Sequence, residues 1–308
     1  MKQTLFIAPL TIAIGLTFII NAEQAKQVHL QKNIEITAPL ALGEFFDKLT
    51  ILMIKRERIH DSTKRINIDK EYDLLNSIYH NAIISSKALS ELIADLLTVN
   101  KTLWDLEDAI REKERLKEFD DEFKQLAKAI PENNDKRFII KRFINMLLAS
   151  DIIEEKSYAE TLARTGEIDI EATDTYHNMV PIMSIPISLA DLLDRISILE
   201  IKQKKIADQE KLINIRNEYN TLMAIYKKTI APSEELAKLC QKLIASNEKM
   251  WNIQEEIRKK IITAELDQEF IEYARGVYYT NDERVNIKHT INKLLNSELI
   301  DEKQYTEY

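Results

Sequence analysis

The sequence is poor in residues that break helices and in residues that build the common catalytic and metal sites. Its 308 residues include only 4 glycines and 6 prolines, so little of the chain is suited to tight turns. The single cysteine, Cys240, excludes an intrachain disulfide framework and a zinc site made of cysteines. The glycines are isolated from one another, which excludes a glycine-rich loop that cradles a phosphate. Long helices joined by short connections are therefore expected, without a metal or a cofactor.

Positive charge is not concentrated anywhere in the sequence. The formal net charge is -8, and Lys and Arg do not form a dense block. Proteins that bind nucleic acids need a concentrated cationic surface that releases counterions from the phosphates, so no nucleic-acid partner is expected. With 45% hydrophobic and 31% charged residues, the composition is that of a globular protein.

The first segment has the composition of an export signal. Lys2 precedes an apolar run over residues 4–20, and the small residue Ala22 follows this run. The pattern is typical of a cleaved secretory signal, but the run is also nearly long enough to anchor the chain in a membrane, and a buried helix is a third interpretation. We expect residues 1–22 to be a signal peptide or a membrane anchor, followed by a polar linker over residues 23–33. Both interpretations place the body outside the cytoplasm, in the periplasm or secreted, with membrane contact only through this segment.

The remainder of the chain is one unit repeated in tandem. The block LALGEFFDKLTILMIKRERI at residues 40–59 returns as ISLADLLDRISILEIKQKKI at residues 187–206. Paired positions such as Asp47 and Asp194 are always 147 residues apart, and roughly a third of the pairs are identical. A gapless match of this length indicates two domains of one fold. The predicted divisions are repeat unit 1 at residues 34–158, a linker at 159–180 and repeat unit 2 at 181–305.

Apolar residues recur at three- and four-residue steps, which predicts helices throughout each unit. Asp120 and Asp267 are expected to cap a fourth helix, and Asn134-Asp135 to cap a fifth. The segment before the first helix reads as extended, with a short strand as the alternative. The predicted fold class is all-α, with two tandem copies of a roughly five-helix antiparallel bundle unit. In unit 1 the expected helices lie at residues 42–59, 66–84, 87–117, from 120 onward, and 134–150.

The comparison of the two units excludes a functional site that depends on histidine and occurs in both units. Positions that differ between the copies cannot be essential to a role that both perform, and every histidine differs or lies outside the unit. A general base or a metal ligand of this type is therefore not expected in a shared site. The pairs are His60 with Ala207, His80 with Lys227 and Arg142 with His289, while His29 and His177 lie outside the repeated unit.

Several polar residues are retained in both units and share faces of the predicted third and fifth helices, because they are spaced three or four residues apart. Together they would offer indoles, guanidiniums, lysines and amides. Such a set could hold a phosphate or carboxylate and stack a sugar ring on tryptophan. The candidate ligand-binding residues are Asn100, Trp104, Arg111, Arg137, Lys141, Asn145, Asn247, Trp251, Arg258, Arg284, Lys288 and Asn292.

The same residues have a structural interpretation. Asp108 and Arg111 are spaced for an ion pair within one helix, and Trp104 could anchor the core. Arg137 and Lys141 could bridge helices of the bundle. The sequence leaves both interpretations open, and it assigns no catalytic residue.

The blocks DKLTILMIK, VNKTLWDLEDAIR and EEKSY occur in this order in unit 1 and return in altered form in unit 2. They resemble an uncharacterised bacterial all-helical domain family that is usually met as a single unit of about this length. The resemblance covers both units and implies no activity. Three functions follow as hypotheses. We favour an exported, non-catalytic helical module that binds an anionic or carbohydrate ligand or an envelope protein. A structural, self-assembling protein is the alternative, and a helical-bundle enzyme acting on an anionic small molecule is the third.

Overall fold

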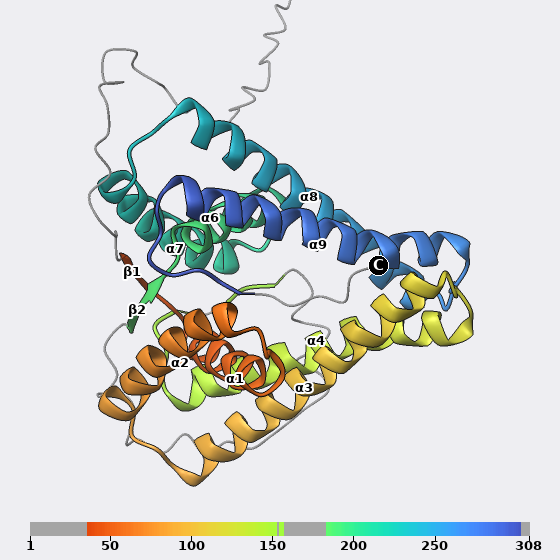
Figure 1. Cartoon of the computed structure of the whole chain (residues 1–308), viewed down its shortest axis with the longest axis horizontal. Coiled ribbons are helices and arrows are strands. Elements are labelled where there is room, and N and C mark those ends of the chain that lie inside the picture. Colours follow the sequence, from red (N-terminus) through yellow and green to blue (C-terminus); the bar gives the residue numbers. More distant parts are fainter. Residues whose placement is uncertain (1–35, 153, 157–182, 303–308) are drawn as a thin grey trace, which may run out of the picture.

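The computed structural model describes residues 36–152, 154–156 and 183–302. Unit 1 begins with strand β1 and continues with four helices, and unit 2 repeats this order (Figure 1). The predicted all-α fold in two tandem copies is therefore confirmed. The elements are β1 (Ile36–Pro39), α1 (Leu42–Arg58), α2 (Ser62–Ala82), α3 (Lys87–Leu116) and α4 (Asp121–Leu147), then β2 (Ser184–Ile187), α6 (Leu189–Lys205), α7 (Gln209–Thr229), α8 (Glu234–Ile262) and α9 (Gln268–Leu294).

Three sequence predictions concern segments outside the described residues. They are the signal peptide or anchor at residues 1–22 and the linkers at residues 23–33 and 159–180. Within the described part, no helix is long and apolar enough to cross a membrane.

Short polar side chains begin most of the helices. Asp120 Oδ1 accepts a hydrogen bond from the Phe123 amide at 3.0 Å, and Asp267 Oδ1 accepts one from the Phe270 amide at 2.9 Å. These bonds satisfy amides that have no partner within the first turn. The predicted caps of the fourth helix are therefore confirmed in both units.

The predicted break between a fourth and a fifth helix is wrong. α4 runs without interruption from Asp121 to Leu147 with Pro131 inside it, so four helices per unit are present in the described residues. Asn134 does not cap a new helix, because its Nδ2 donates to the Ile130 carbonyl one turn earlier at 3.2 Å. Asp135 instead forms an ion pair with Arg258 of unit 2.

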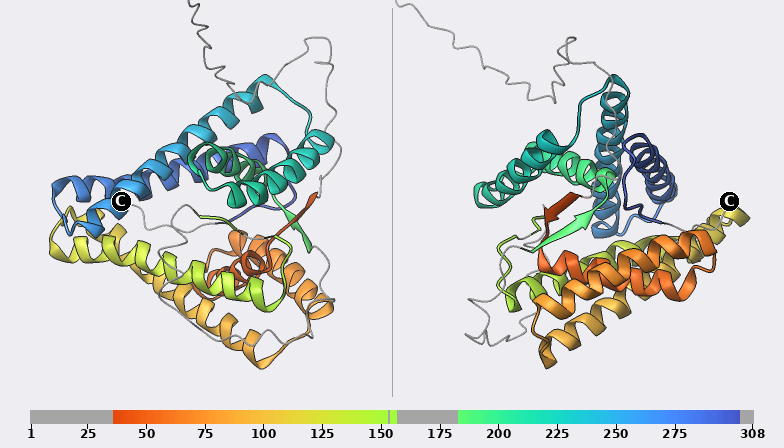
Figure 2. Two further views of the ribbon diagram at one scale, coloured as in Figure 1. Left: turned by 180° about the vertical axis from the view of Figure 1, so that it is seen from behind. Right: turned by 60° about the vertical axis from the view of Figure 1, so that its left-hand side comes forward.

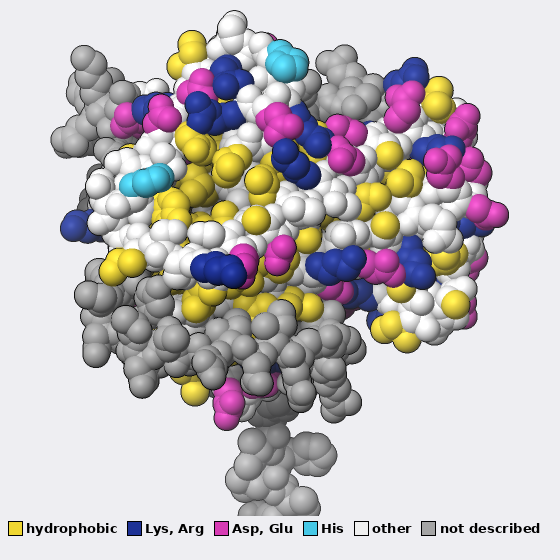
Figure 3. All heavy atoms as spheres, turned by 90° about the horizontal axis from the view of Figure 1, so that it is seen from below, with side chains coloured by type: hydrophobic (Ala, Val, Ile, Leu, Met, Phe, Trp, Pro, Cys, Tyr) yellow, Lys and Arg dark blue, Asp and Glu magenta, His cyan; other side chains and the backbone are white. Residues whose placement is uncertain are grey.

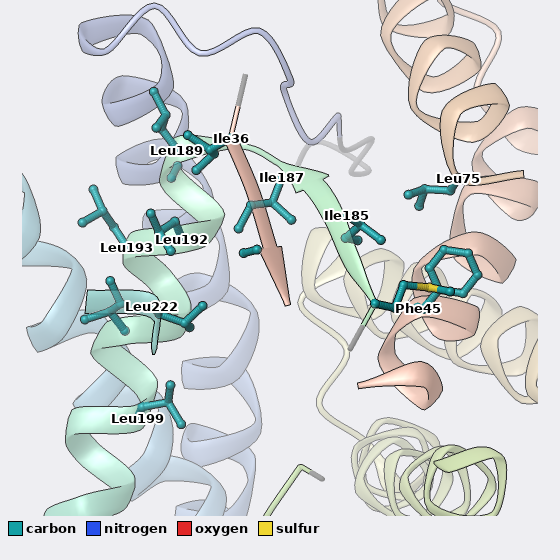
Figure 4. Close-up of a cluster of buried hydrophobic side chains, with 14 of the residues drawn as sticks. Ile36, Phe45, Leu75, Ile185, Ile187, Leu189, Leu192, Leu193, Leu199 and Leu222 are labelled. Atoms are coloured by element: carbon teal, nitrogen blue, oxygen red, sulfur yellow. The ribbon is translucent and has the colours of Figure 1, made fainter. Parts of the chain in front are cut away.

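The two units are joined by a two-stranded antiparallel sheet. β1 of unit 1 pairs with β2 of unit 2, with Ile36 opposite Ile187 and Ala38 opposite Ile185. These side chains belong to one apolar core that includes residues of both units, such as Phe45 and Leu192 (Figure 4). The extended lead-ins of the two units thus form strands only by pairing with each other.

The helix tips make a second junction between the units. Figures 1 and 2 show the α3–α4 and α8–α9 tips side by side, at the end opposite the strands. A smaller apolar cluster fills this junction with equivalent residues from each unit. Its equivalent pairs are Ile110 with Ile257, Phe123 with Phe270, and Ala127 with Ala274.

Six polar contacts between the units form three equivalent pairs, in which the roles of the two units are exchanged, as in a two-fold related interface. The duplicated chain is therefore organised like a symmetric dimer. The pairs are Arg111–Asp282 with Arg258–Asp135, Lys55–Asp301 with Lys202–Glu154, and Asn67–Glu302 with Asn214–Glu155.

On the face of the molecule that Figure 3 shows, cationic and acidic side chains are interspersed.

One position makes the two units unequal in helix spacing. A Cβ on Gly43 would lie 2.3 Å from the carbonyl oxygen of Lys141, so α1 approaches the α4 backbone directly. Ala190 occupies the equivalent position of unit 2. The hydrogen bond from each amide to the last helix of its unit differs accordingly: Gly43 to Asn145 on α4 is 2.6 Å, and Ala190 to Asn292 on α9 is 2.9 Å.

We expect Gly43→Ala to lower the free energy of unfolding by about 1–3 kcal/mol, because the two helices must move apart. Urea denaturation monitored by circular dichroism measures this loss. The matched control is Ala190→Gly, which creates no clash and should cost no more than about 1 kcal/mol. Equal losses for the two variants would contradict the proposed difference in spacing.

Candidate functional site

A cavity of about 660 Å³ lies between the two units. Most of its walls come from α1, α3 and α4 of unit 1 and from α6, α8 and α9 of unit 2, and Ile185 and Ile187 of β2 also line it. The volume lies within the range of small-molecule sites. Because both units contribute to the walls, neither unit alone contains the site.

Seven of the twelve candidate residues line this cavity, and five do not. The cavity therefore brings together residues from four predicted helix faces, two in each unit, that sequence spacing alone could not connect. The lining residues are Asn100, Trp104, Arg111, Arg137, Arg258, Arg284 and Lys288. Lys141, Asn145, Asn247, Trp251 and Asn292 are not part of the described lining.

Asp47 is the centre of the polar wall in unit 1. This buried carboxylate accepts from both Nε and Nη2 of Arg137, with the Nε bond at 2.6 Å, and from Asn100 Nδ2 at 3.0 Å. Burial alone would raise the pKa of Asp47, but the charges of Arg137 and Lys141 hold it below its usual range. The carboxylate is thus ionised and held in a fixed orientation at the cavity wall.

Asp194 has the same role in unit 2. Arg284 binds it through Nε at 3.0 Å and through Nη2, and Asn247 Nδ2 donates to it at 2.9 Å. Burial opposes ionisation here too, but Arg284 and Lys288 lower the pKa of Asp194 to about 2. The polar arrangement of the two walls is therefore duplicated along with the fold.

Arg111 and Arg258 bind carboxylates of the opposite unit. The Nη atoms of Arg111 lie 3.0 and 2.8 Å from the oxygens of Asp282, and those of Arg258 lie 2.8 and 2.7 Å from Asp135. Bidentate pairs of this kind fix geometry as well as adding energy. These arginines therefore hold the units together beside the cavity.

Two candidate amides have a structural function. Asn145 Oδ1 accepts from the Gly43 amide, and Asn292 Oδ1 accepts from the Ala190 amide, both at the beginning of a helix. They satisfy helix N-terminal donors and lie outside the described lining. Lys141, another candidate outside the lining, forms ion pairs with Glu44 and Glu154. For these residues the structural interpretation accounts for their retention in both units.

The two tryptophans are in different environments although they occupy equivalent positions. Trp104 lines the cavity, whereas Trp251 does not belong to the described lining and donates from Nε1 to Glu255 Oε1 at 2.8 Å. Both rings pack partly against the main apolar core. Only unit 1 therefore presents an indole to the cavity.

The comparison of the two units missed some carboxylates of the cavity, because one unit has a glutamate where the other has an aspartate. Glu44 and Asp191 are equivalent, and so are Glu154 and Asp301; three of these four line the cavity. A search for identical residues discards such pairs. A search for equal charge at paired positions would have found them.

The site offers hydrogen-bond donors and acceptors rather than an evident reacting group. No group of three or more His, Cys, Asp or Glu side chains in the described part of the chain could hold a metal ion. Carboxylates and guanidiniums of the walls, such as Asp47 with Arg137 and Asp194 with Arg284, are paired with each other, and each such group can form further hydrogen bonds. This arrangement is suited to holding a polar molecule in a defined orientation.

The chain is thus a tandem pair of helical domains that share one cavity lined by both polar and apolar side chains. The profile of the Family of unknown function (DUF6165) matches residues 32–168 and again residues 183–308. The chain belongs to this family and contains its domain twice, which confirms the resemblance seen in the sequence. No curated protein and no solved structure matches the chain.

Proposed function

We propose that this protein is a non-catalytic binding module that holds an oligosaccharide-class ligand in the cavity between its two units. The observation that carries the proposal is the convergence of Trp104, the Asp47–Arg137 pair and the Asp194–Arg284 pair on one cavity of about 660 Å³. The leader-like composition of residues 1–22 further supports a site of action outside the cytoplasm.

The charge balance of the walls favours a ligand rich in hydroxyl groups. The described lining contains nine cationic side chains and eight carboxylates. A ligand with several charges would have to separate buried pairs, and breaking such a pair costs about 3–5 kcal/mol. Hydroxyl groups donate and accept, so they can bind oriented carboxylates and guanidiniums without separating them.

The exposed part of Trp104 supplies the apolar contact that a sugar ring needs. An indole offers a large flat face, and its polar edge can remain hydrogen-bonded during stacking. Because Trp251 is not in the described lining, the ligand would stack in the half of the cavity built by unit 1. The site would therefore hold one ligand in one orientation despite its duplicated walls.

The presence of only two tryptophans makes this proposal directly testable. In Trp251→Phe the sole indole is Trp104. We expect labelled protein to bind members of a glycan array of neutral and acidic oligosaccharides. We also expect the bound glycans to change the fluorescence of Trp251→Phe in a saturable manner.

Trp104→Phe is the matched control, because its remaining indole is not in the described lining and its fluorescence should stay constant. Val277→Trp narrows the cavity from α9 and should abolish glycan binding, while circular dichroism checks that the variant keeps its helices. An array without bound glycans, or binding that survives Val277→Trp, would refute the proposal.

A further inference from the structure

Asp108 is a carboxylate of the cavity wall that is held differently from Asp47 and Asp194. Those two carboxylates are buried, and a guanidinium binds each of them in an ion pair. Asp108 lines the same cavity, but it is exposed and forms no ion pair with another residue of the described structure. A ligand can therefore reach its oxygens without separating an ion pair.

Within the described part of the chain, Asp108 does not form the ion pair with Arg111 that their spacing favours. Arg111 instead binds Asp282 of the other unit with both Nη atoms, at 3.0 and 2.8 Å. Desolvation has the largest effect on Asp108 and raises its pKa. Hydrogen bonding from Trp104 and the charges of Arg58 and Arg111 oppose this rise without cancelling it. Further hydrogen-bond donors at this carboxylate would thus replace hydration that its present neighbours do not make up for.

Trp104 lies one helical turn before Asp108 on α3, and both side chains line the cavity. Residues four apart share a face of a helix, so the indole and the carboxylate are neighbours. The indole is also held from a second side, because the Arg58 guanidinium lies 5.7 Å from its ring centroid and Asp105 binds Arg58 in an ion pair. Trp104 and Asp108 thus present a flat apolar ring and a carboxylate acceptor next to each other.

The equivalent pair of unit 2 is not part of the described cavity wall. Trp251 Nε1 donates to Glu255 Oε1 at 2.8 Å, so a contact between a tryptophan and a carboxylate is retained there. Neither of these two residues belongs to the described lining. The contact itself is therefore a feature of both units, whereas access of the pair to the cavity is specific to unit 1.

Resting on the proposed function, we infer that Trp104 and Asp108 form the subsite for one neutral sugar ring that has two adjacent free hydroxyl groups. The ring stacks on the indole, and Asp108 accepts a hydrogen bond from each hydroxyl. A carboxylate can accept about four hydrogen bonds, so contact with the indole leaves room for both hydroxyls. Such bonds are about twice as strong as those between neutral groups. An acidic group on the same ring would be repelled, because Asp108 has no ion-pair partner in the described structure.

A panel of methyl hexopyranosides tests this subsite, because each probe offers a single sugar ring. The fluorescence of Trp251→Phe, in which Trp104 is the sole indole, is measured during titration with each glycoside and with its monodeoxy analogues. We expect at least one glycoside to bind saturably, with a dissociation constant on the order of millimolar. Removal of either of two adjacent hydroxyls should weaken its binding about tenfold, and removal of a hydroxyl elsewhere should cost less.

Asp108→Asn separates binding of the hydroxyls from positioning of the indole. Asparagine keeps the size of the side chain and an acceptor for the indole but loses the charge, so the glycoside should bind about tenfold more weakly. In Asp108→Ala the glycoside and its two adjacent deoxy analogues should bind alike. Glu255→Ala is the matched control from unit 2 and should retain both the binding and the preference. Parent-like binding by Asp108→Asn, or a preference that persists in Asp108→Ala, would overturn the inference.

The glycan array distinguishes the failure of this subsite from the failure of the proposed function. Glycans that Val277→Trp no longer binds but Asp108→Asn binds like the parent would overturn the subsite and leave the cavity as the binding site. A methyl glycoside whose binding depends on Asp108, without any glycan bound on the array, would refute the oligosaccharide and leave the single-ring subsite standing. The absence of binding in both measurements would refute both.

Discussion

Replacing Glu114 by alanine is expected to lower the free energy of unfolding by about 3–5 kcal/mol, because it leaves buried cationic and hydroxyl groups without their acceptor. Glu114 is 0% exposed and lies on α3 of unit 1. Arg275 of unit 2 donates to both of its oxygens, at 2.9 and 3.1 Å. Tyr278 and Tyr279 donate at 2.5 and 2.8 Å. Urea denaturation at neutral pH measures the loss.

The same carboxylate makes stability depend on pH in a defined direction. Burial alone would raise the pKa of Glu114, but hydrogen bonds from Arg275, Lys117 and the two tyrosines lower it to about 2, from an ordinary value of 4.5. Its contribution is therefore fully present above pH 4.5 and is lost as the pH falls toward 2. The unfolding free energies of the parent and of Glu114→Ala should converge over this interval.

Glu112→Ala is the control on the same helix. Its carboxylate pairs with Arg115 but is 45% exposed, and exposed pairs contribute at most about 1 kcal/mol. If Glu112→Ala and Glu114→Ala cost the same, Glu114 does not anchor the junction between the units. A loss for Glu114→Ala that persists unchanged at low pH would point to packing rather than charge.

The comparison of repeats could not have found Glu114. Its equivalent is Ile261, and the equivalents of Arg275 and Tyr278 are Lys128 and Pro131. Each of these residues differs between the units, so a method that keeps shared residues discards all of them. The contacts of Glu114 have no counterpart with the two units exchanged. Only the structure therefore shows where the symmetry between the units ends.

Local rules predicted the helices well, because their causes are local. The caps Asp120 and Asp267 satisfy amides three residues away, and their sequence context contains all of the needed information. Asp135 shows the limit of this reasoning. It was assigned to a helix cap from its neighbours, but its partner Arg258 lies 123 residues away in the other unit. Pairing between units depends on how the copies associate, which no helical period encodes.

The candidate site was predictable in part for the same reason. Positions shared by both units identified Arg137 and Arg284, whose partners Asp47 and Asp194 lie within the same unit. The cavity itself was not predictable, since its walls belong to two units whose arrangement the sequence leaves open. Retention in both copies therefore identified residues that matter. It did not distinguish residues that could contact a ligand from residues that pair with others to stabilise the fold.

Asp47→Ala is expected to lower the free energy of unfolding by about 3–5 kcal/mol, because Arg137 would remain as a partly buried charge without its bidentate partner. Asp194→Ala removes the equivalent partner of Arg284 and should cost a similar amount. The pKa of Asp47 is held low, so this contribution is present above its ordinary value of 3.8 and is lost as the pH falls below it. Urea denaturation of both variants at several pH values gives these quantities.

The double variant Asp47→Ala/Arg137→Ala decides whether the loss comes from the pair. Removing both charges leaves neither one buried alone, so the double variant should be more stable than the sum of the two single losses predicts, by about 1–3 kcal/mol. Additive losses would show that Arg137 finds another acceptor when Asp47 is absent. The cavity wall would then be adaptable rather than fixed, and the double variant would retain the glycan binding measured with Trp104. With a coupled pair, binding falls along with the pair, because the donors and acceptors that orient the ligand are the same atoms that hold α1 against α4.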